Sequence, residues 1–152
     1  MMKYTSFYSP KWIIFALIIV SFIGFLDATY LTVKHYTGTP IACSIFEGCE
    51  KVTTSPYATV FNIPVALYGA LYYLFTFFLS VAYLDTKRNL FISAIPPLTA
   101  IGFIASVWFV YLQLFVIKAI CPYCMISAAT STALFILGIF VLKYKRSHKK
   151  IN

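Results

Sequence analysis

Two cysteines in the last third of the chain have the spacing of a redox-active pair. Cys121 and Cys124 enclose Pro122 and Tyr123, and apolar runs lie on both sides of this Cys-x-x-Cys motif. Proline is favoured at the first position of a helix because the N–H group that it lacks would be unpaired there. The motif therefore predicts a helix start, with Cys121 as the N-cap and Cys124 one turn further on the same face.

A cysteine at the amino end of a helix ionises readily. The unpaired N–H groups and the positive end of the helix dipole stabilise its thiolate. The pair is therefore expected to cycle between dithiol and disulfide. Two small buried residues of a membrane helix would be the plain alternative, but the proline is in register with the helix start. Zinc is a second alternative, and it needs three or four ligands.

The composition indicates an integral membrane protein. Of 152 residues, 61% are hydrophobic and 11% are charged, and the mean hydropathy is +0.87. A soluble domain of this size does not have that balance, so we expect a single membrane domain over residues 1–152. The net charge of +8 does not indicate nucleic acid as a partner, because the basic residues gather at the ends of the apolar runs, where topology requires them.

Four apolar segments are long enough to cross a bilayer. They cover residues 12–33, 64–84, 90–117 and 121–142. The first is expected to be a retained helix and not a signal peptide, because it continues past Asp27 to Val33 with no small-x-small cleavage site after it. Two interpretations of Asp27 are equally compatible with the sequence: an interfacial carboxylate that reaches water, and a functional group. Pro96-Pro97 should kink the third helix or mark its true start.

Residues 34–63 are the only long polar segment, and they hold the other two cysteines, Cys43 and Cys49. Ser55-Pro56 is typical of an N-cap followed by the first helical residue. We predict a short helix from Pro56 to Phe61 at the membrane interface. The expected fold is thus an all-α four-transmembrane-helix bundle whose outward loop carries a short interfacial helix.

The basic residues predict the orientation of the bundle. Nine lie on one side of the four predicted helices, namely Lys3, Lys11, Lys87, Arg88, Lys143, Lys145, Arg146, Lys149 and Lys150, and three on the other, namely Lys34, Lys51 and Lys118. Both termini should therefore be cytoplasmic in a multi-pass protein of the cell membrane. All four cysteines then lie on the extracytoplasmic face, where disulfides persist.

Four cysteines can pair in three ways, and a static disulfide framework is one interpretation. A relay is the other, because a pair in a flexible loop beside a fixed pair can exchange disulfides by thiolate attack. The fixed pair must then pass electrons to an acceptor in the membrane. His35 is the only outward histidine, and no ligand set for haem, an iron–sulfur cluster or another metal is visible. A lipid-soluble quinone is the simplest acceptor.

The order of the motifs resembles the vitamin K epoxide reductase family, in its prokaryotic form. The resemblance covers the chain from the first helix to the last and is carried by Cys43, Cys49, Ser55, Phe61-Asn62-Ile63-Pro64, Gly69 and Cys121-Pro122-Tyr123-Cys124. The DsbB family performs similar chemistry on another four-helix bundle. Its two cysteine pairs follow the opposite order along the chain.

The resemblance implies a role for each cysteine. Cys124 would face the quinone, Cys121 would exchange with Cys49, and Cys43 would exchange with a thioredoxin-like protein. Ser55 matches a serine of the family that caps the loop helix near the active site. Many bacterial relatives carry a fused thioredoxin-like domain after a fifth helix. Because this chain ends after the fourth, a stand-alone form with a separate extracytoplasmic partner is expected.

Two departures bear on the acceptor. The animal enzymes have an asparagine where this chain has Val65, and a tyrosine where it has Ala128. A plain quinone of the menaquinone, ubiquinone or vitamin K type is therefore expected, and not the epoxide. The candidates for the quinone pocket are aromatic residues predicted near the outer leaflet, namely Phe61, Tyr68, Tyr111 and Phe115.

The predicted function is that of a quinone-dependent thiol-disulfide oxidoreductase that promotes disulfide formation in outward-facing proteins. Two other functions remain open. The four thiols could capture a soft metal such as copper or zinc, although thiols on an oxidising face would have to stay reduced. The chain could also be a structural membrane subunit with inert disulfides.

Overall fold

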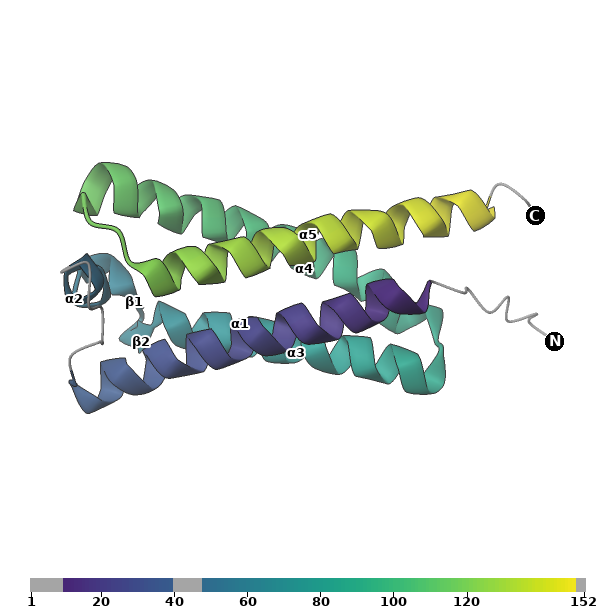
Figure 1. The fold of residues 1–152 in the computed structure, drawn as a ribbon, viewed down its shortest axis with the longest axis horizontal. Coiled ribbons are helices and arrows are strands. Elements are labelled where there is room, and N and C mark those ends of the chain that lie inside the picture. The colour runs from purple at the N-terminus through teal and green to yellow at the C-terminus, as the bar shows by residue number, and fades with distance from the viewer. Residues whose placement is uncertain (1–9, 40–47, 150–152) are drawn as a thin grey trace.

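The computed structural model describes residues 10–39 and 48–149. Its four long helices are α1 (Lys11–Thr37), α3 (Val65–Thr86), α4 (Asn89–Tyr111) and α5 (Pro122–Lys149). The last turns of the third span form a π-helical segment, η2 (Leu112–Ile117). All four spans are long and apolar enough to cross a membrane, and they run along one common direction (Figure 1). The predicted four-helix bundle is confirmed, and the chain is a multi-pass membrane protein.

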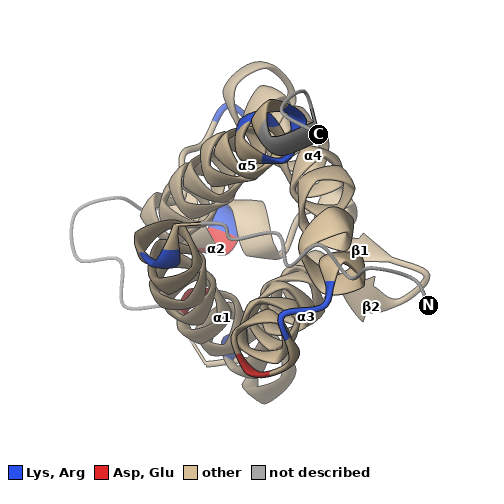
Figure 2. Ribbon diagram, turned by 90° about the vertical axis from the view of Figure 1, so that its right-hand side faces the viewer, with Lys and Arg blue, Asp and Glu red and all other residues tan. Residues whose placement is uncertain are grey.

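The four helices form a closed ring. α1 packs against α3 and α5, and α4 packs against the same two helices. Figure 2 looks along this ring from the end at which α1 begins and α5 ends. At that end the interior is filled by fully buried side chains from α1, α4 and α5, which include Ile13, Leu17, Ile92, Leu134 and Val141. This packing of buried apolar side chains fills one end of the bundle.

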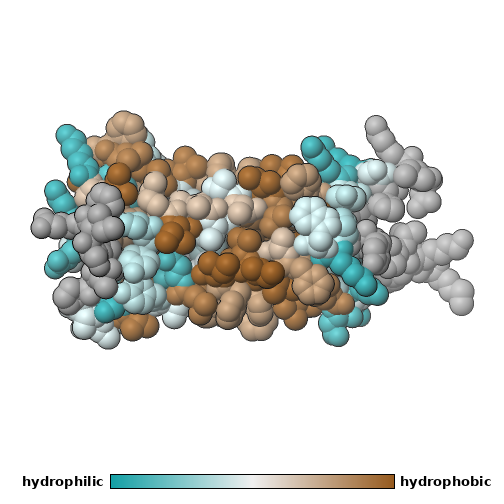
Figure 3. All heavy atoms as spheres, in the orientation of Figure 1, coloured by the Kyte–Doolittle hydropathy of each residue, from teal (hydrophilic) through white to brown (hydrophobic). Residues whose placement is uncertain are grey.

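The outer surface of the ring is apolar. Large side chains point outward along the spans, among them Phe15, Phe75, Ile101, Ile104 and Trp108. Figure 3 shows this as a hydrophobic band between two hydrophilic ends. Such a band suits contact with lipid tails. Apolar side chains gain no free energy by moving from lipid into the protein interior, because lipid tails are equally apolar.

Short elements cover the opposite end. They are α2 (Gly48–Thr53), the 3₁₀ turn η1 (Pro56–Ala58), and a two-stranded antiparallel hairpin of β1 (Thr59–Val60) and β2 (Ile63–Pro64). α2 lies across this end of the ring (Figures 1 and 2). Neither α2 nor the hairpin was predicted from the sequence.

The predicted helix from Pro56 to Phe61 is therefore wrong beyond Ala58. Phe61 and Asn62 both have positive φ values, of 53° and 61°, and form the two-residue turn between β1 and β2. Two consecutive left-handed residues are typical of a type I′ hairpin turn, whose twist matches that of the strands. A helix cannot continue through that backbone conformation.

Pro96 and Pro97 lie inside α4, which begins at Asn89. The alternative that they mark the true start of the third helix is therefore wrong. The predicted bounds of the first and last helices were too short, because α1 continues to Thr37 and α5 to Lys149. Both extensions consist largely of polar residues that project beyond the apolar band, where hydropathy alone gives no signal.

Candidate active site

The Cys-x-x-Cys motif lies where α5 begins. Pro122 is the first residue of the helix, and the carbonyl oxygen of Cys121 accepts a hydrogen bond of 3.0 Å from the N–H of Met125. Cys121 thus occupies the position of an N-cap, as predicted. Cys121 and Cys124 are free thiols, the first buried and the second partly exposed.

The surroundings of Cys121 favour its thiolate. A hydrogen bond from the Cys124 side chain, helped by the N–H groups of Cys124 and Tyr123, lowers the pKa of Cys121 from its usual value near 9 to about 7. Burial and the negative charge of Asp27 oppose this shift. A thiol of low pKa is a good leaving group in disulfide exchange. Cys121 is therefore suited to be released from a mixed disulfide with a second pair.

Gln113 holds the segment that leads into this helix. Its backbone carbonyl accepts the N–H groups of Lys118 and Ala119, the latter at 3.1 Å. Its side-chain oxygen accepts the N–H of Cys121, also at 3.1 Å. Gln113 itself is buried, with 3% of its surface exposed. Gln113 was not predicted from the sequence, although a lone amide in an apolar span is a signal of function in membrane proteins.

Cys49, in α2, lies near Cys121. Cys49, Val52 and Cys121 form one buried cluster, and Cys124 packs against it. The contact is close because Gly48 begins α2, and a Cβ atom there would overlap the carbonyl oxygen of Ile120. Cys49 takes part in a disulfide bond. The remaining predicted cysteine, Cys43, lies outside the described residues.

Ser55 does not cap the turn η1 through its side chain. Its hydroxyl instead donates a hydrogen bond of 2.8 Å to the carbonyl oxygen of Val52, near the end of α2. The predicted side-chain cap is therefore wrong. Only the backbone carbonyl of Ser55 supports η1, by accepting the N–H of Ala58 at 2.9 Å. Ser55 also lines the cavity below α2.

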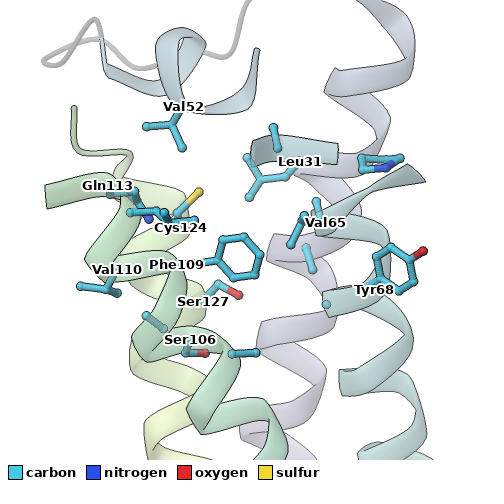
Figure 4. Close-up of a pocket in the computed structure, with 18 of the residues that line it drawn as sticks. Leu31, Val52, Val65, Tyr68, Ser106, Phe109, Val110, Gln113, Cys124 and Ser127 are labelled. Carbon is cyan, nitrogen blue, oxygen red and sulfur yellow. The ribbon is translucent and has the colours of Figure 1, made fainter. Parts of the chain in front are cut away.

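A cavity of about 350 Å³ lies inside the ring of helices, beneath α2. Most of its wall is apolar and includes Leu31, Val52, Val65 and Phe109, and Cys124 reaches the same space (Figure 4). Val65 and Ala128, the two positions that depart from the animal pattern, both line it. An apolar cavity of this size with few polar groups is typical of a site for a small organic molecule.

The four predicted aromatic residues divide into two groups. Tyr68 lines the cavity (Figure 4). Phe61, at the hairpin turn, is 90% exposed and is not among the lining residues. Tyr111 and Phe115 are also exposed and do not line the cavity. Their rings contact each other, with centroids 5.0 Å apart.

Metal ligands do not gather in the part of the chain that the structure describes. Among the side chains that the structure describes, no group of three or more His, Cys, Asp or Glu could hold an ion. His35 lines the cavity mentioned above.

Comparison with known proteins agrees with the order of the motifs. A family model described as the vitamin K epoxide reductase family matches residues 15–139. The thiol-disulfide oxidoreductase LTO1 of Arabidopsis thaliana is 34% identical to this chain over 135 residues, which cover 84% of the chain and 36% of LTO1. The chain thus spans about a third of the length of this curated relative. The expected prokaryotic, stand-alone form stays a prediction.

Proposed function

Because the chain belongs to the vitamin K epoxide reductase family, we propose that it is a membrane thiol oxidoreductase that transfers electrons from a thioredoxin-like protein to a quinone. The observation that carries this proposal is the position of the Cys121–Cys124 pair. Cys121 packs in one buried cluster with Cys49 and Val52, and Cys124 lines an apolar cavity. A pair placed between a second cysteine and a membrane cavity can pass electrons from one to the other. Similarity to LTO1, a thiol-disulfide oxidoreductase, supports the same class of chemistry.

Electrons enter the relay at the loop. The thiols of the partner reduce a Cys43–Cys49 disulfide and become a disulfide themselves. The Cys49 thiolate then attacks Cys121 of an oxidised Cys121–Cys124 pair, so that a Cys49–Cys121 bond forms and Cys124 leaves as a thiolate. Attack of Cys43 on Cys49 restores the loop disulfide and releases Cys121. The net result is an oxidised partner and a reduced pair at the start of α5.

Electrons leave through Cys124. A quinone accepts two electrons and two protons and departs as the quinol. The cavity fits such a molecule because its wall is apolar and it opens beside the Cys124 thiol. In the same step the thiols of Cys121 and Cys124 close to a disulfide.

A plain quinone suits this cavity better than an epoxide. Val65 and Ala128 present only methyl groups to the cavity, at positions where the animal enzymes place an amide and a phenol. Hydrogen-bonding side chains are what a site needs to select one polar substrate over a close analogue. We therefore propose menaquinone, ubiquinone or a quinone of the vitamin K type as the acceptor.

The orientation of the bundle follows from its charges. The α3–α4 turn with Lys87 and Arg88 and the basic end of α5 lie at the end of the bundle where α1 begins, and Lys51 and Lys118 lie at the other. By the positive-inside rule, we propose that both termini are cytoplasmic and that α2 and the cysteines face outward. The partner would then be an extracytoplasmic protein.

Quinone reduction by the purified protein tests the proposal. The protein in detergent, supplied with excess dithiol, should bleach the absorbance of the oxidised quinone, and the Cys124→Ala variant should not. Cys43→Ala should block reduction by a protein partner but still allow small thiols to reduce the inner pair. Absence of turnover with every quinone, although Cys121 and Cys124 cycle freely, would refute the proposal.

A further inference from the structure

The protein uses only one half of the Gln113 amide group. The amide oxygen accepts the backbone N–H of Cys121 at 3.1 Å. Only an oxygen can accept that N–H, so the orientation of the amide is fixed and its NH₂ group is left as a donor. The NH₂ group has no acceptor among the described residues, although Gln113 is buried with 3% of its surface exposed. Such an amide is unfavourable unless another molecule accepts the remaining N–H bonds.

A molecule can reach this NH₂ group. The Gln113 nitrogen has no protein acceptor in the described part of the chain, yet it is not among the fully buried atoms that lack a partner, so it keeps accessible surface. Gln113 lines the cavity, and it also borders a groove on the outer side that is lined by Lys51 and Lys118. The group that meets the NH₂ can therefore be a ligand in the cavity or water in the groove.

The π-helical end of the third span turns Gln113 inward. Leu112 and Gln113 are both buried, whereas Tyr111 and Leu114 on either side of them are exposed. A π turn interrupts the regular spacing of a helix, and such turns are frequent at functional sites. The interior position of this amide is thus a product of the irregular turn.

Gln113 and Cys124 face the same space. Both line the cavity, and their side chains lie next to each other in Figure 4. The hydrogen bond from Gln113 to Cys121 holds the amide at the level where α5 begins. Cys124 follows Cys121 by about one helical turn. A ligand beside the Cys124 thiol would therefore also lie beside the free NH₂ group.

Several hydroxyl groups of the cavity wall, in contrast, already have partners. The hydroxyls of Tyr72 and Ser131 pair with each other. The hydroxyl of Tyr73 donates a hydrogen bond of 2.6 Å to the carbonyl oxygen of Ser127. These groups have less reason to bind a ligand than an amide whose donors are unused.

The other polar residues of the wall lie away from the redox pair. Ser106 comes seven residues before Gln113, which corresponds to about 10.5 Å along a helix, and Figure 4 shows it further along the cavity from Cys124. His35 lines the cavity from α1, across the ring from the end of the third span. Of the described side chains on the wall, Gln113 is the one that is hydrogen-bonded to the Cys-x-x-Cys motif.

We propose that the NH₂ group of Gln113 binds the quinone carbonyl oxygen that lies nearer to Cys124. This inference rests on the proposed function and deepens it. Val65 and Ala128 offer only methyl groups to the cavity. Gln113 would thus supply, from the third span, a hydrogen-bond donor that these positions on α3 and α5 lack.

The amide also acts on the reaction itself. In the overall step, the S–H bonds of Cys121 and Cys124 break, an S–S bond forms, and the two electrons and two protons convert the quinone into the quinol. Negative charge develops on the quinone oxygens as electrons arrive. A donor that the Cys121 N–H already holds in place stabilises this charge without reorganisation. The amide keeps its own protons, because both protons of the quinol come from the thiols.

Nuclear magnetic resonance tests the contact without any substitution, because Gln113 is the only glutamine of the chain. Protein labelled with ¹⁵N at the glutamine side chain should show one pair of NH₂ proton resonances. In the full-length protein in detergent, with the Cys121–Cys124 disulfide closed, 1,4-naphthoquinone should bind without reacting. One resonance of the pair should then move downfield, as expected for a proton that gains an acceptor. Naphthalene, which has the same rings but no oxygen, controls for the effect of the rings alone.

Equal shifts with the two ligands would overturn the inference. So would an unmoved pair in a protein that reduces 1,4-naphthoquinone, and water in the outer groove would then be the acceptor of the NH₂ group. Both outcomes leave the proposed function intact.

Gln113→Met tests the role in the reaction. This substitution removes the donor and the bond to Cys121 together, so two oxidants are compared in single turnovers of the reduced Cys121–Cys124 pair. One is 1,4-naphthoquinone, and the other is a small disulfide, which has no carbonyl oxygen. The rate with the quinone should fall about 10-fold more than the rate with the disulfide, the size of one hydrogen bond to a developing charge. Leu114→Met, at the adjacent exposed position, should keep both rates at the parental value.

The two oxidants also separate the possible failures. Equal loss with both would mean that Gln113 acts only through the Cys121 backbone, and would overturn the inference. If Gln113→Met does not fold, the resonance measurement on the parent still decides. A parent that the small disulfide oxidises but that reduces no quinone would instead contradict the proposed function.

Discussion

The backbone N–H of Cys121 donates a hydrogen bond of 3.1 Å to the side-chain oxygen of Gln113, eight residues earlier in the chain. The bond joins the π-helical end of the third span to the first residue of the redox motif. It also orients the Gln113 side chain, because the oxygen is engaged and the NH₂ group is left as a donor. The residue that closes the third span thereby fixes the position of the cysteine that must exchange.

Gln113→Met should therefore weaken the positioning of the Cys121 backbone. Methionine matches the shape of glutamine but offers no comparable acceptor, so the buried N–H of Cys121 would lose its partner, at about 1–3 kcal/mol. We expect a lower thermal midpoint in detergent and slower reduction of the inner disulfide by the loop pair. Leu114→Met, at the adjacent exposed position, is the matched control. Equal behaviour of the two variants would show that the hydrogen bond is dispensable.

The reactivity of the reduced pair should depend on pH around neutrality. Because the hydrogen bond from Cys124 lowers the pKa of Cys121 to about 7, Cys121 is a thiolate above that pH and becomes protonated as the pH falls below it. The ultraviolet absorbance of the thiolate in the reduced protein should rise with a midpoint near 7. Attack of the reduced Cys121 on a small external disulfide should slow on the acid side of the same midpoint.

Variants of Cys124 test the cause of that shift. Cys124→Ser keeps a hydrogen-bond donor beside Cys121, so the midpoint should stay low. Cys124→Ala removes the donor, and the midpoint should move up towards the ordinary value near 9. If alanine and serine gave the same midpoint, the shift would have to come from the helix N-terminus alone.

Gly48→Ala should separate the two halves of the relay. The added Cβ would overlap the carbonyl oxygen of Ile120, so α2 must move away from the segment that holds Cys121. We expect exchange between Cys49 and Cys121 to slow by about 10-fold, as for an overpacked contact of 1–3 kcal/mol. Stopped-flow reduction of the inner disulfide by a protein dithiol measures this step.

The control for Gly48→Ala is Gly38→Ala. Gly38 has a φ of +62° but no atom within 4 Å of an added Cβ. This variant strains the backbone at the end of α1 without touching the cysteines. An equal effect of both variants on exchange would contradict a role for the contact between Gly48 and Ile120.

The parts of the fold that follow from local pattern could be predicted from the sequence. The four spans follow from hydropathy and length, and the start of α5 from a proline next to a cysteine. The hairpin was missed because Ser55-Pro56 is equally compatible with a helix and a single turn. What decides between them is the left-handed backbone of Phe61 and Asn62, and Phe61 gives no local signal for it.

The polar groups of the cavity could not be found from sequence for a different reason. Tyr72 belongs to an aromatic stripe along its helix, and nothing local distinguishes it from Tyr68 or Phe75. The position of its hydroxyl depends on Ser131 and Gly102, which come from two other helices. Which helices are neighbours, and at what rotation, is a property of tertiary packing and not of periodicity.

The closeness of α1 and α3 should make one glycine indispensable to stability. A Cβ atom at Gly24 would overlap the buried ring of Tyr73, and that ring cannot move without losing its hydroxyl bonds to Ser127 and Thr130. Gly24→Ala should therefore destabilise the protein by about 1–3 kcal/mol, as overpacking does elsewhere.

Gly69, also on the α1–α3 contact, provides the control. An added Cβ there would meet only the Cβ of Ala28 at 3.7 Å, an ordinary contact. Gly69→Ala should keep the thermal midpoint or raise it slightly, since alanine is the better helix former. Equal thermal midpoints for the two variants in detergent would mean that the Tyr73 ring can move away from the added Cβ. The hydrogen bonds of Tyr73 would then not anchor α3 to α5.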